Sequence, residues 1–269
     1  MFDFIYGIHE IVEHIFKHMD LKSQLNFISC NKFLRYTYSH LIRIDDIRLL
    51  TNNDVEKKFF DNCTSCYLNS KLKRYPRYLQ KAVLPDGFNE FIDYDIIPNS
   101  ISHLTSGFYS NKPITNLPNS ITHLTFSYAF NQPVNNLPNS ITHLIFDYSF
   151  DQPVNNLPNS ITHLKFRGRF NQPINNLPKS ITHLKLGVFF NQPISNLPES
   201  IIHLKLGAHF NQPISDLPKS ITHLTFGGAF NQSIRHLPKS ITHLTFYRVF
   251  YEFKLEDVPA SVTHLKFMF

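Results

Sequence analysis

The chain has 269 residues, of which 42% are hydrophobic and 17% are charged, so we predict a globular protein and exclude a disordered one. No apolar run approaches the ~18 residues that a membrane-spanning helix needs, and the N-terminus lacks the basic start of a signal peptide, so no membrane association is predicted. The net charge of +6 is unevenly distributed along the chain. Residues 86–160 hold one lysine and six acidic residues, whereas residues 161–248 hold ten Lys or Arg and two acidic residues. Such a charge asymmetry is informative about binding partners rather than about the fold.

Residues 1–45 carry the pattern of three short helices. Between residues 8 and 19 the apolar side chains recur at the i, i+3, i+4 and i+7 spacing of an amphipathic helix. A second apolar stripe covers residues 21–28 and a third covers residues 33–41. These stripes predict a small helical domain at the start of the chain.

This order of helices resembles an F-box domain. The residues that carry the resemblance are Glu10-Ile11-Val12 with Ile15-Phe16, Asp20-Leu21 with Leu25, and Cys30-Asn31-Lys32-Phe33. Gly7-Ile8 stands where F-boxes usually have Leu-Pro. The resemblance implies docking to the Skp-type adaptor of a cullin-RING ubiquitin ligase through Ile11, Ile15, Phe16, Leu21 and Leu25. The alternative is that the helices only cap the rest of the chain and bind no partner.

Residues 46–72 are interpreted as a linker that leads to the repeats. Cys63 and Cys66 have C-x-x-C spacing, but a zinc site of this kind needs a second pair, so we predict no metal site here. Three cysteines give no disulfide framework and fit a reducing compartment, which predicts a cytoplasmic protein.

From residue 100 to residue 267 one motif is written nine times, with a period of 20 residues and a histidine in each copy from His103 to His264. A short fixed period predicts a solenoid, in which each coil buries its apolar face against its neighbours. Two prolines in each copy exclude helices. We therefore predict a mainly β, right-handed repeat solenoid of about ten 20-residue coils over residues 73–269, with a parallel sheet on one face.

The copy at residues 120–139 shows the expected strand. Leu124 and Phe126 should face the core, and His123 and Thr125 should face outward, because side chains alternate along a strand. An asparagine follows a buried phenylalanine in most copies, as at Asn131, and its side chain is expected to bond the turn backbone of the next coil.

The first and last coils are degenerate. Lys73–Pro98 keeps the offsets of the motif with two residues added, and we interpret it as an N-terminal coil. Phe250–Asp257 replaces the turn motif in the last copy with one residue added, which suggests a C-terminal cap that shields the edge of the sheet.

The motif Phe170-Asn171-Gln172-Pro173-Ile174 and its copies resemble the FNIP repeat, a relative of leucine-rich repeats, although the unit here is about two residues shorter than usual. Such repeats are abundant in social amoebae and in giant viruses of amoebae, and the viral proteins combine them with F-boxes. The resemblance implies that the repeats choose a substrate for ubiquitin transfer, in the host cytoplasm if the protein is viral.

The histidine column suggests a metal site, but a structural zinc site needs four ligands in a tetrahedron, which a single row of imidazoles does not provide. We expect stacked, mostly neutral rings that are bonded to the hydroxyls of the Thr122 column and are sensitive to acid. The recurring Ser-x-x-His has no acid partner, and no phosphate-binding loop is present in the sequence, so neither an enzyme nor a cofactor is predicted.

Two columns of varying residues are expected to point outward beside the histidines. The first holds Lys165, Lys185 and Lys205 in register, and the second holds Asp147 and Arg167 with several glycines. Three stacked lysines repel each other, which suggests an acidic protein substrate, although a solvated surface is the alternative. The predicted binding residues are His123, Tyr128, His143, Tyr148, Lys165, Arg167, Arg169, Lys185 and Lys205.

Three functions follow from these observations. The first is a substrate-recruiting adaptor of a ubiquitin ligase, and the second is a stand-alone binding solenoid whose helices are only a cap. The third is a nucleic-acid binder that uses the Lys/Arg patch, which the acidic residues 86–160 and the lack of aromatic-basic interleaving disfavour.

Overall fold

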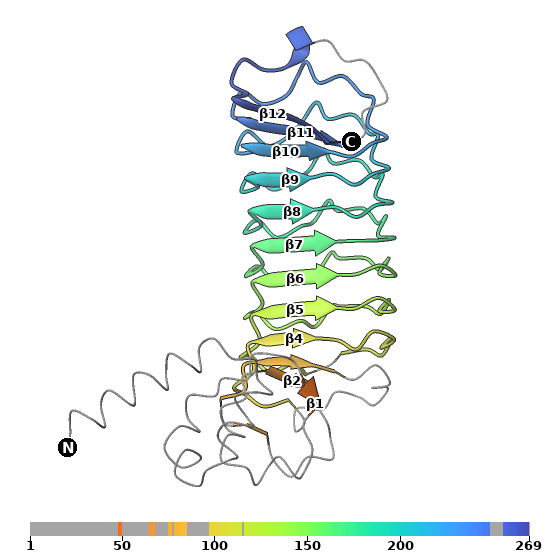
Figure 1. Cartoon of the computed structure of the whole chain (residues 1–269), viewed down its shortest axis with the longest axis vertical. Coiled ribbons are helices and arrows are strands. Elements are labelled where there is room, and N and C mark those ends of the chain that lie inside the picture. Colours follow the sequence, from red (N-terminus) through yellow and green to blue (C-terminus); the bar gives the residue numbers. More distant parts are fainter. Residues whose placement is uncertain are drawn as a thin grey trace, which may run out of the picture. The chain divides into compact units, whose positions relative to one another are not determined.

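A computed structural model of the chain describes residues 48–49, 65–67, 75–76, 78–84, 97–114, 116–247 and 255–268 (Figure 1). The chain divides into two units, Met1–Val83 and Leu84–Phe269. In the first unit three short parallel strands pair in chain order, namely β1 (Arg48–Leu49), β2 (Ser65–Tyr67) and β3 (Lys81–Val83). The helices predicted over residues 1–45 lie outside the described residues.

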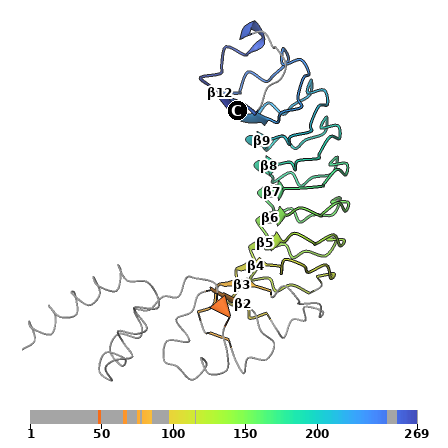
Figure 2. The same cartoon turned by 45° about the vertical axis from the view of Figure 1, so that its right-hand side comes forward.

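The second unit is a ladder of nine parallel strands, one for each copy of the motif (Figures 1 and 2). Each histidine pairs with the histidine of the next copy, as His123 does with His143, so the 20-residue period sets the register. The sheet therefore covers one face of the coils, as predicted. The strands are β4 (His103–Thr105), β5 (His123–Phe126), β6 (His143–Phe146), β7 (His163–Phe166), β8 (His183–Lys185), β9 (His203–Lys205), β10 (His223–Phe226), β11 (His243–Tyr247) and β12 (His264–Met268).

The core consists of apolar columns that run through the stacked coils. Leu124 and Phe126 are fully buried while His123 and Thr125 are half-buried, which confirms the predicted alternation. Within one coil Phe126 stacks on Phe130 with ring centroids 3.9 Å apart, and between coils it stacks on Phe146 at 5.2 Å. Aromatic rings in such contact add stabilisation beyond the area they bury.

The asparagine column forms the predicted ladder of side-chain hydrogen bonds. The backbone N–H of Asn131 donates to Oδ1 of Asn111 at 2.8 Å, and Nε2 of Gln132 donates to the same oxygen at 3.2 Å. Where Asp151 replaces asparagine, its carboxylate accepts the corresponding bonds from Asn171 and Gln172. The column therefore needs an oxygen acceptor in each coil and tolerates either an amide or a carboxylate.

Replacing Asn171 by alanine should lower the free energy of unfolding by about 1 kcal/mol, because the N–H of Asn191 loses its acceptor at 2.9 Å. Urea unfolding of the purified variant measures this change. The control is Asn171→Asp, which keeps an oxygen in place as Asp151 does and should cost less than the alanine variant. Equal stability of the alanine variant and the native chain would show that the ladder contributes nothing.

The C-terminal end of the sheet is partly open. A short 3-10 helix, η3 (Leu255–Asp257), precedes β12, and Asp257 accepts a hydrogen bond from Nε of Arg235 at 2.8 Å. Leu265 and Phe267, on the β12 face that continues the core columns, are 36% and 40% exposed. Residues 250–254 of the predicted cap lie outside the described residues, so the cap stays a prediction. Among the described residues, no helix is long and apolar enough to cross a membrane.

Candidate binding face of the solenoid

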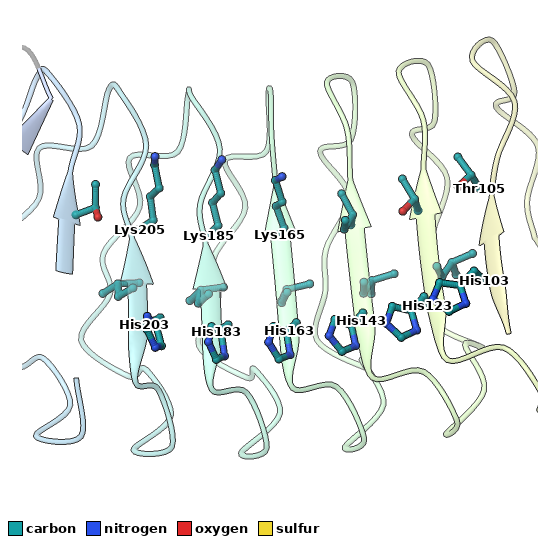
Figure 3. Close-up of a pocket in the computed structure, with 18 of the residues that line it drawn as sticks. His103, Thr105, His123, His143, His163, Lys165, His183, Lys185, His203 and Lys205 are labelled. Carbon is teal, nitrogen blue, oxygen red and sulfur yellow. The ribbon is translucent and has the colours of Figure 1, made fainter. Parts of the chain in front are cut away.

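The outer face of the sheet carries an unbroken row of imidazole rings, here called the histidine ladder, from His103 to His264. Figure 3 shows its rings from His103 to His203. Neighbouring rings stack with centroids 4.0 to 4.3 Å apart. Nδ1 of His123 shares a hydrogen bond of 2.8 Å with the hydroxyl of Thr122, and the same pairing recurs in the following coils except at His203, which Ile202 precedes. The predicted stacking of the rings and their bonds to the threonine column are confirmed.

Burial lowers the pKa of His143, and the charges of neighbouring imidazoles lower it further. The same two causes, in the same order, lower the pKa of His123, His163, His203 and His223. The ladder therefore favours neutral rings near pH 7. Within the described ranges, no group of three or more His, Cys, Asp or Glu side chains is arranged to hold a metal ion.

Lys165, Lys185 and Lys205 lie in register on β7, β8 and β9, two residues beyond the histidines. In Figure 3 their ammonium groups point away from the histidine ladder, toward the ends of the strands. Burial lowers the pKa of Lys185, and the two neighbouring lysines lower it further. Lys205 differs from the others because its Nζ lies 3.3 Å from the hydroxyl of Tyr247 and 4.3 Å from the centre of that ring.

The predicted aromatic and arginine side chains meet on the neighbouring turns. The ring of Tyr128 stacks on Tyr148 at 5.1 Å and on Phe108 at 5.0 Å. The guanidinium of Arg169 lies 5.3 Å above Tyr148. Arg167 reaches Asp147 at 3.3 Å, in a pair that is exposed to solvent. Because the tyrosine rings lie face to face, they present edges and hydroxyls to a partner.

Two grooves run across the strands, one on each side of the lysines. The first, of about 550 Å³, lies along the histidine ladder from His103 to His223 and is bounded by the column that contains Thr105, Ile145 and Lys165. The second, of about 760 Å³, is here called the lysine groove. It is lined by Lys165, Arg167, Lys185, Leu186, Val188, Lys205, Leu206, Gly207, Ala208, Gly227, Gly228 and Tyr247.

The family model of the FNIP repeat matches six overlapping stretches, which together span residues 110 to 248. The chain belongs to the FNIP-repeat family. The F-box domain model matches residues 9–37. Families of both kinds are typically modules of protein interaction.

The FNIP solenoid is similar to the crystal structure of CroV588, a novel circular LRR protein from a giant virus, with 40% sequence identity and a TM-score of 0.68. The similarity covers 82% of this chain and 35% of CroV588, so this chain spans about a third of the length of that protein. None of the curated proteins is significantly similar in sequence.

The glycines of the second varying column correct one prediction from the sequence. That column was expected to point outward throughout, but Gly187 and Gly207 are buried. A Cβ at Gly207 would overlap the carbonyl oxygen of Gly187, and a Cβ at Gly187 would lie 2.8 Å from the carbonyl oxygen of Gly168. At Gly187 and Gly207 the backbones of neighbouring FNIP coils lie too close together for a side chain to fit. At Asp147 and Arg167, in the same column, the side chains do point outward.

Sequence reasoning named Tyr128, Tyr148 and Arg169 as candidate binding residues without predicting their mutual contacts, and it did not name two further aromatic side chains. Phe108 occupies the position of Tyr128 one coil earlier, and that shared position was the signal that could have identified it. Tyr247 reaches Lys205 across two coils because Gly227, which occupies its position in the coil between them, has no side chain. Only the stacking geometry shows this second contact.

Proposed function

We propose that this chain recruits proteins to a cullin-RING ubiquitin ligase. In this proposal the F-box at residues 9–37 docks to a Skp-type adaptor, and the FNIP solenoid holds the protein to be modified. The observation that supports it is the combination, in one chain, of an F-box with a repeat solenoid whose outer face carries two grooves.

The proposal assigns a role to each part of the chain. Residues 1–45 form the adaptor-binding domain, residues 46–72 connect it to the repeats, and residues 73–269 form the solenoid of about ten coils. The adaptor contacts are assigned to Ile11, Ile15, Phe16, Leu21 and Leu25, which lie outside the described residues. These assignments rest on the apolar stripes of the sequence and on the F-box match.

Co-purification with a Skp-type adaptor tests the proposal. The native chain should retain the adaptor, and the double variant Ile15→Asp, Leu25→Asp should lose at least tenfold in affinity, because carboxylates would replace apolar contact residues. The matched control is His14→Asp, Asn26→Asp, which adds the same two carboxylates outside the apolar stripes and should keep the interaction.

The adaptor role would be wrong if the folded native chain fails to bind. It would also be wrong if both double variants bind as tightly as the native chain. Either result would favour the second candidate, a binding solenoid without a link to ubiquitin transfer, because the two grooves of the solenoid do not depend on the F-box.

A further inference from the structure

We propose that the lysine groove binds an acidic peptide segment in extended conformation, which runs across the strands from β7 to β11. This inference rests on the proposed function in taking a protein as the partner, and it specifies which class of protein segment the solenoid selects. Acidic side chains of the segment would lie beside Lys165, Lys185 and Lys205, and its backbone would lie on the floor of the groove.

The charges in the groove are unbalanced. Arg167 has Asp147 as a partner at 3.3 Å, whereas Lys165 and Lys185 make no ion pair with any described residue. Burial and neighbouring cations lower the pKa of Lys165 and Lys185, whereas Asp147 acts in the opposite direction on Lys165 only. A ligand with several carboxylates would relieve this repulsion, because opposite charges at short distance stabilise the charged form.

The shape of the groove follows from differences between the repeats. Asp147 and Arg167 occupy the column beyond the lysines in two successive coils, whereas Gly187, Gly207 and Gly227 occupy it in the next three coils and Tyr247 in the one after. The floor, which includes Gly207, Gly227 and the exposed Ala208, therefore carries no large polar side chain, and a ligand can lie against it. Arg167 marks one end of the groove and Tyr247 marks the other.

The length of the groove fits a short extended peptide. Parallel strands lie about 4.8 Å apart, so the four steps from β7 to β11 span about 19 Å. At about 3.3 Å per residue, this distance accommodates about six residues. Alternate side chains of an extended chain point the same way about 6.6 Å apart, so two carboxylates can lie against the three lysines, which span about 10 Å.

The walls of the groove favour a peptide over a nucleic acid. Val188 and the turn backbone around Ala208 offer apolar contact area beside the cations. Bases of a single strand need open aromatic faces on which to stack. Among the described residues, Tyr247 is the one aromatic side chain that lines the groove, and the ammonium of Lys205 contacts its ring.

The test is fluorescence anisotropy with the full chain and a labelled octapeptide of alternating Glu and Ser, beside the same peptide with Gln in place of Glu. The triple variant Lys165→Gln, Lys185→Gln, Lys205→Gln should bind the acidic peptide at least tenfold more weakly than the native chain. The matched control is Lys179→Gln, Lys219→Gln, Lys239→Gln, which removes the same charge from exposed turns of the coils and should bind within twofold of the native chain.

A second variant keeps all three lysines and guards against a folding defect. Ala208 is exposed on the floor of the groove, so Ala208→Glu should fold normally and place a carboxylate where the peptide is expected to lie. It should also weaken binding of the acidic peptide at least tenfold. Thermal unfolding of each variant confirms that the solenoid is intact.

Several outcomes would overturn the proposal. Equal loss of binding in the two triple variants would show only nonspecific attraction by net charge. Equal binding of the Gln peptide would exclude recognition of carboxylates. Tighter binding of an oligothymidylate, with a steep loss between low and moderate salt, would assign the groove to nucleic acid, because phosphate contacts are strongly salt-dependent.

The assay contains no adaptor, so its result is independent of the ligase role. Peptide binding by a chain that fails to capture the adaptor would support the groove and contradict the ligase role. If the chain binds the adaptor but not the acidic peptide, the ligase role is supported and the proposal that the lysine groove binds acidic peptides is contradicted.

Discussion

Phe146→Ala should lower the free energy of unfolding by about 3–5 kcal/mol, the cost expected for deleting a buried phenylalanine ring from a packed core. The side chain is fully buried. Its ring centroid lies 3.8 Å from that of Phe150 in the same coil and 5.2 to 5.3 Å from those of Phe126 and Phe166 in the neighbouring coils. The hydrogen-bonded sheet fixes the separation of the coils, so they cannot collapse into the cavity.

Urea unfolding followed by circular dichroism measures this effect. The matched control is Phe189→Ala, since Phe189 is 38% exposed and its loss should cost about 1 kcal/mol or less. Phe146→Leu should cost less than the alanine variant, because Leu186 and Leu206 occupy the same column directly after β8 and β9 and are buried there. A small and equal effect of all three substitutions would contradict a tightly packed phenylalanine column.

The regular part of the fold was predictable because the copies of the motif from His103 to His243 all have the same length. A 20-residue period places each residue beside its equivalent in the next coil, so His123 must lie beside His143 and Asn111 beside Asn131. Alternation along the strand then separates Leu124, which is buried, from His123, which faces outward. The asparagine bonds and the stacked imidazoles follow from this registry.

The lysine groove was not predictable from the period, because it arises where the copies differ. Glycines at 187 and 207 were expected to point outward like Arg167, and the sequence alone does not show that the next backbone fills that space. The contact of Tyr247 with Lys205 depends in turn on the gap that Gly227 leaves. These features require distances between coils, which a residue pattern does not give.

Lowering the pH from 7.5 to 5.0 should lower the Tm of the solenoid by roughly 4–8 °C, the shift expected from a loss of a few kcal/mol in a chain of this size. Burial and neighbouring imidazoles lower the pKa of five rings in the histidine ladder, among them His123, His143 and His163. In the unfolded chain these rings return to a pKa near 6.5. The unfolded state therefore takes up protons first, and stability is lost as the pH falls below about 6.5.

The groups that act on these rings are imidazoles above and below, while Lys165, Lys185 and Lys205 stand two residues further along their strands. Solvent screening reduces each contribution because the rings are only half-buried, so the effect comes from many small increments. Added salt should weaken the pH dependence, since it screens the repulsion between charged rings.

Thermal unfolding between pH 7.5 and 5.0 measures this dependence, and two variants identify its source. The triple variant His123→Gln, His143→Gln, His163→Gln should show a smaller fall in Tm than the native chain, because it removes three of the shifted rings. His209→Gln, His236→Gln removes two exposed imidazoles outside the ladder and should leave the fall unchanged. A Tm that does not vary over this range, or a triple variant as acid-sensitive as the native chain, would show that protonation of the ladder costs the folded state nothing.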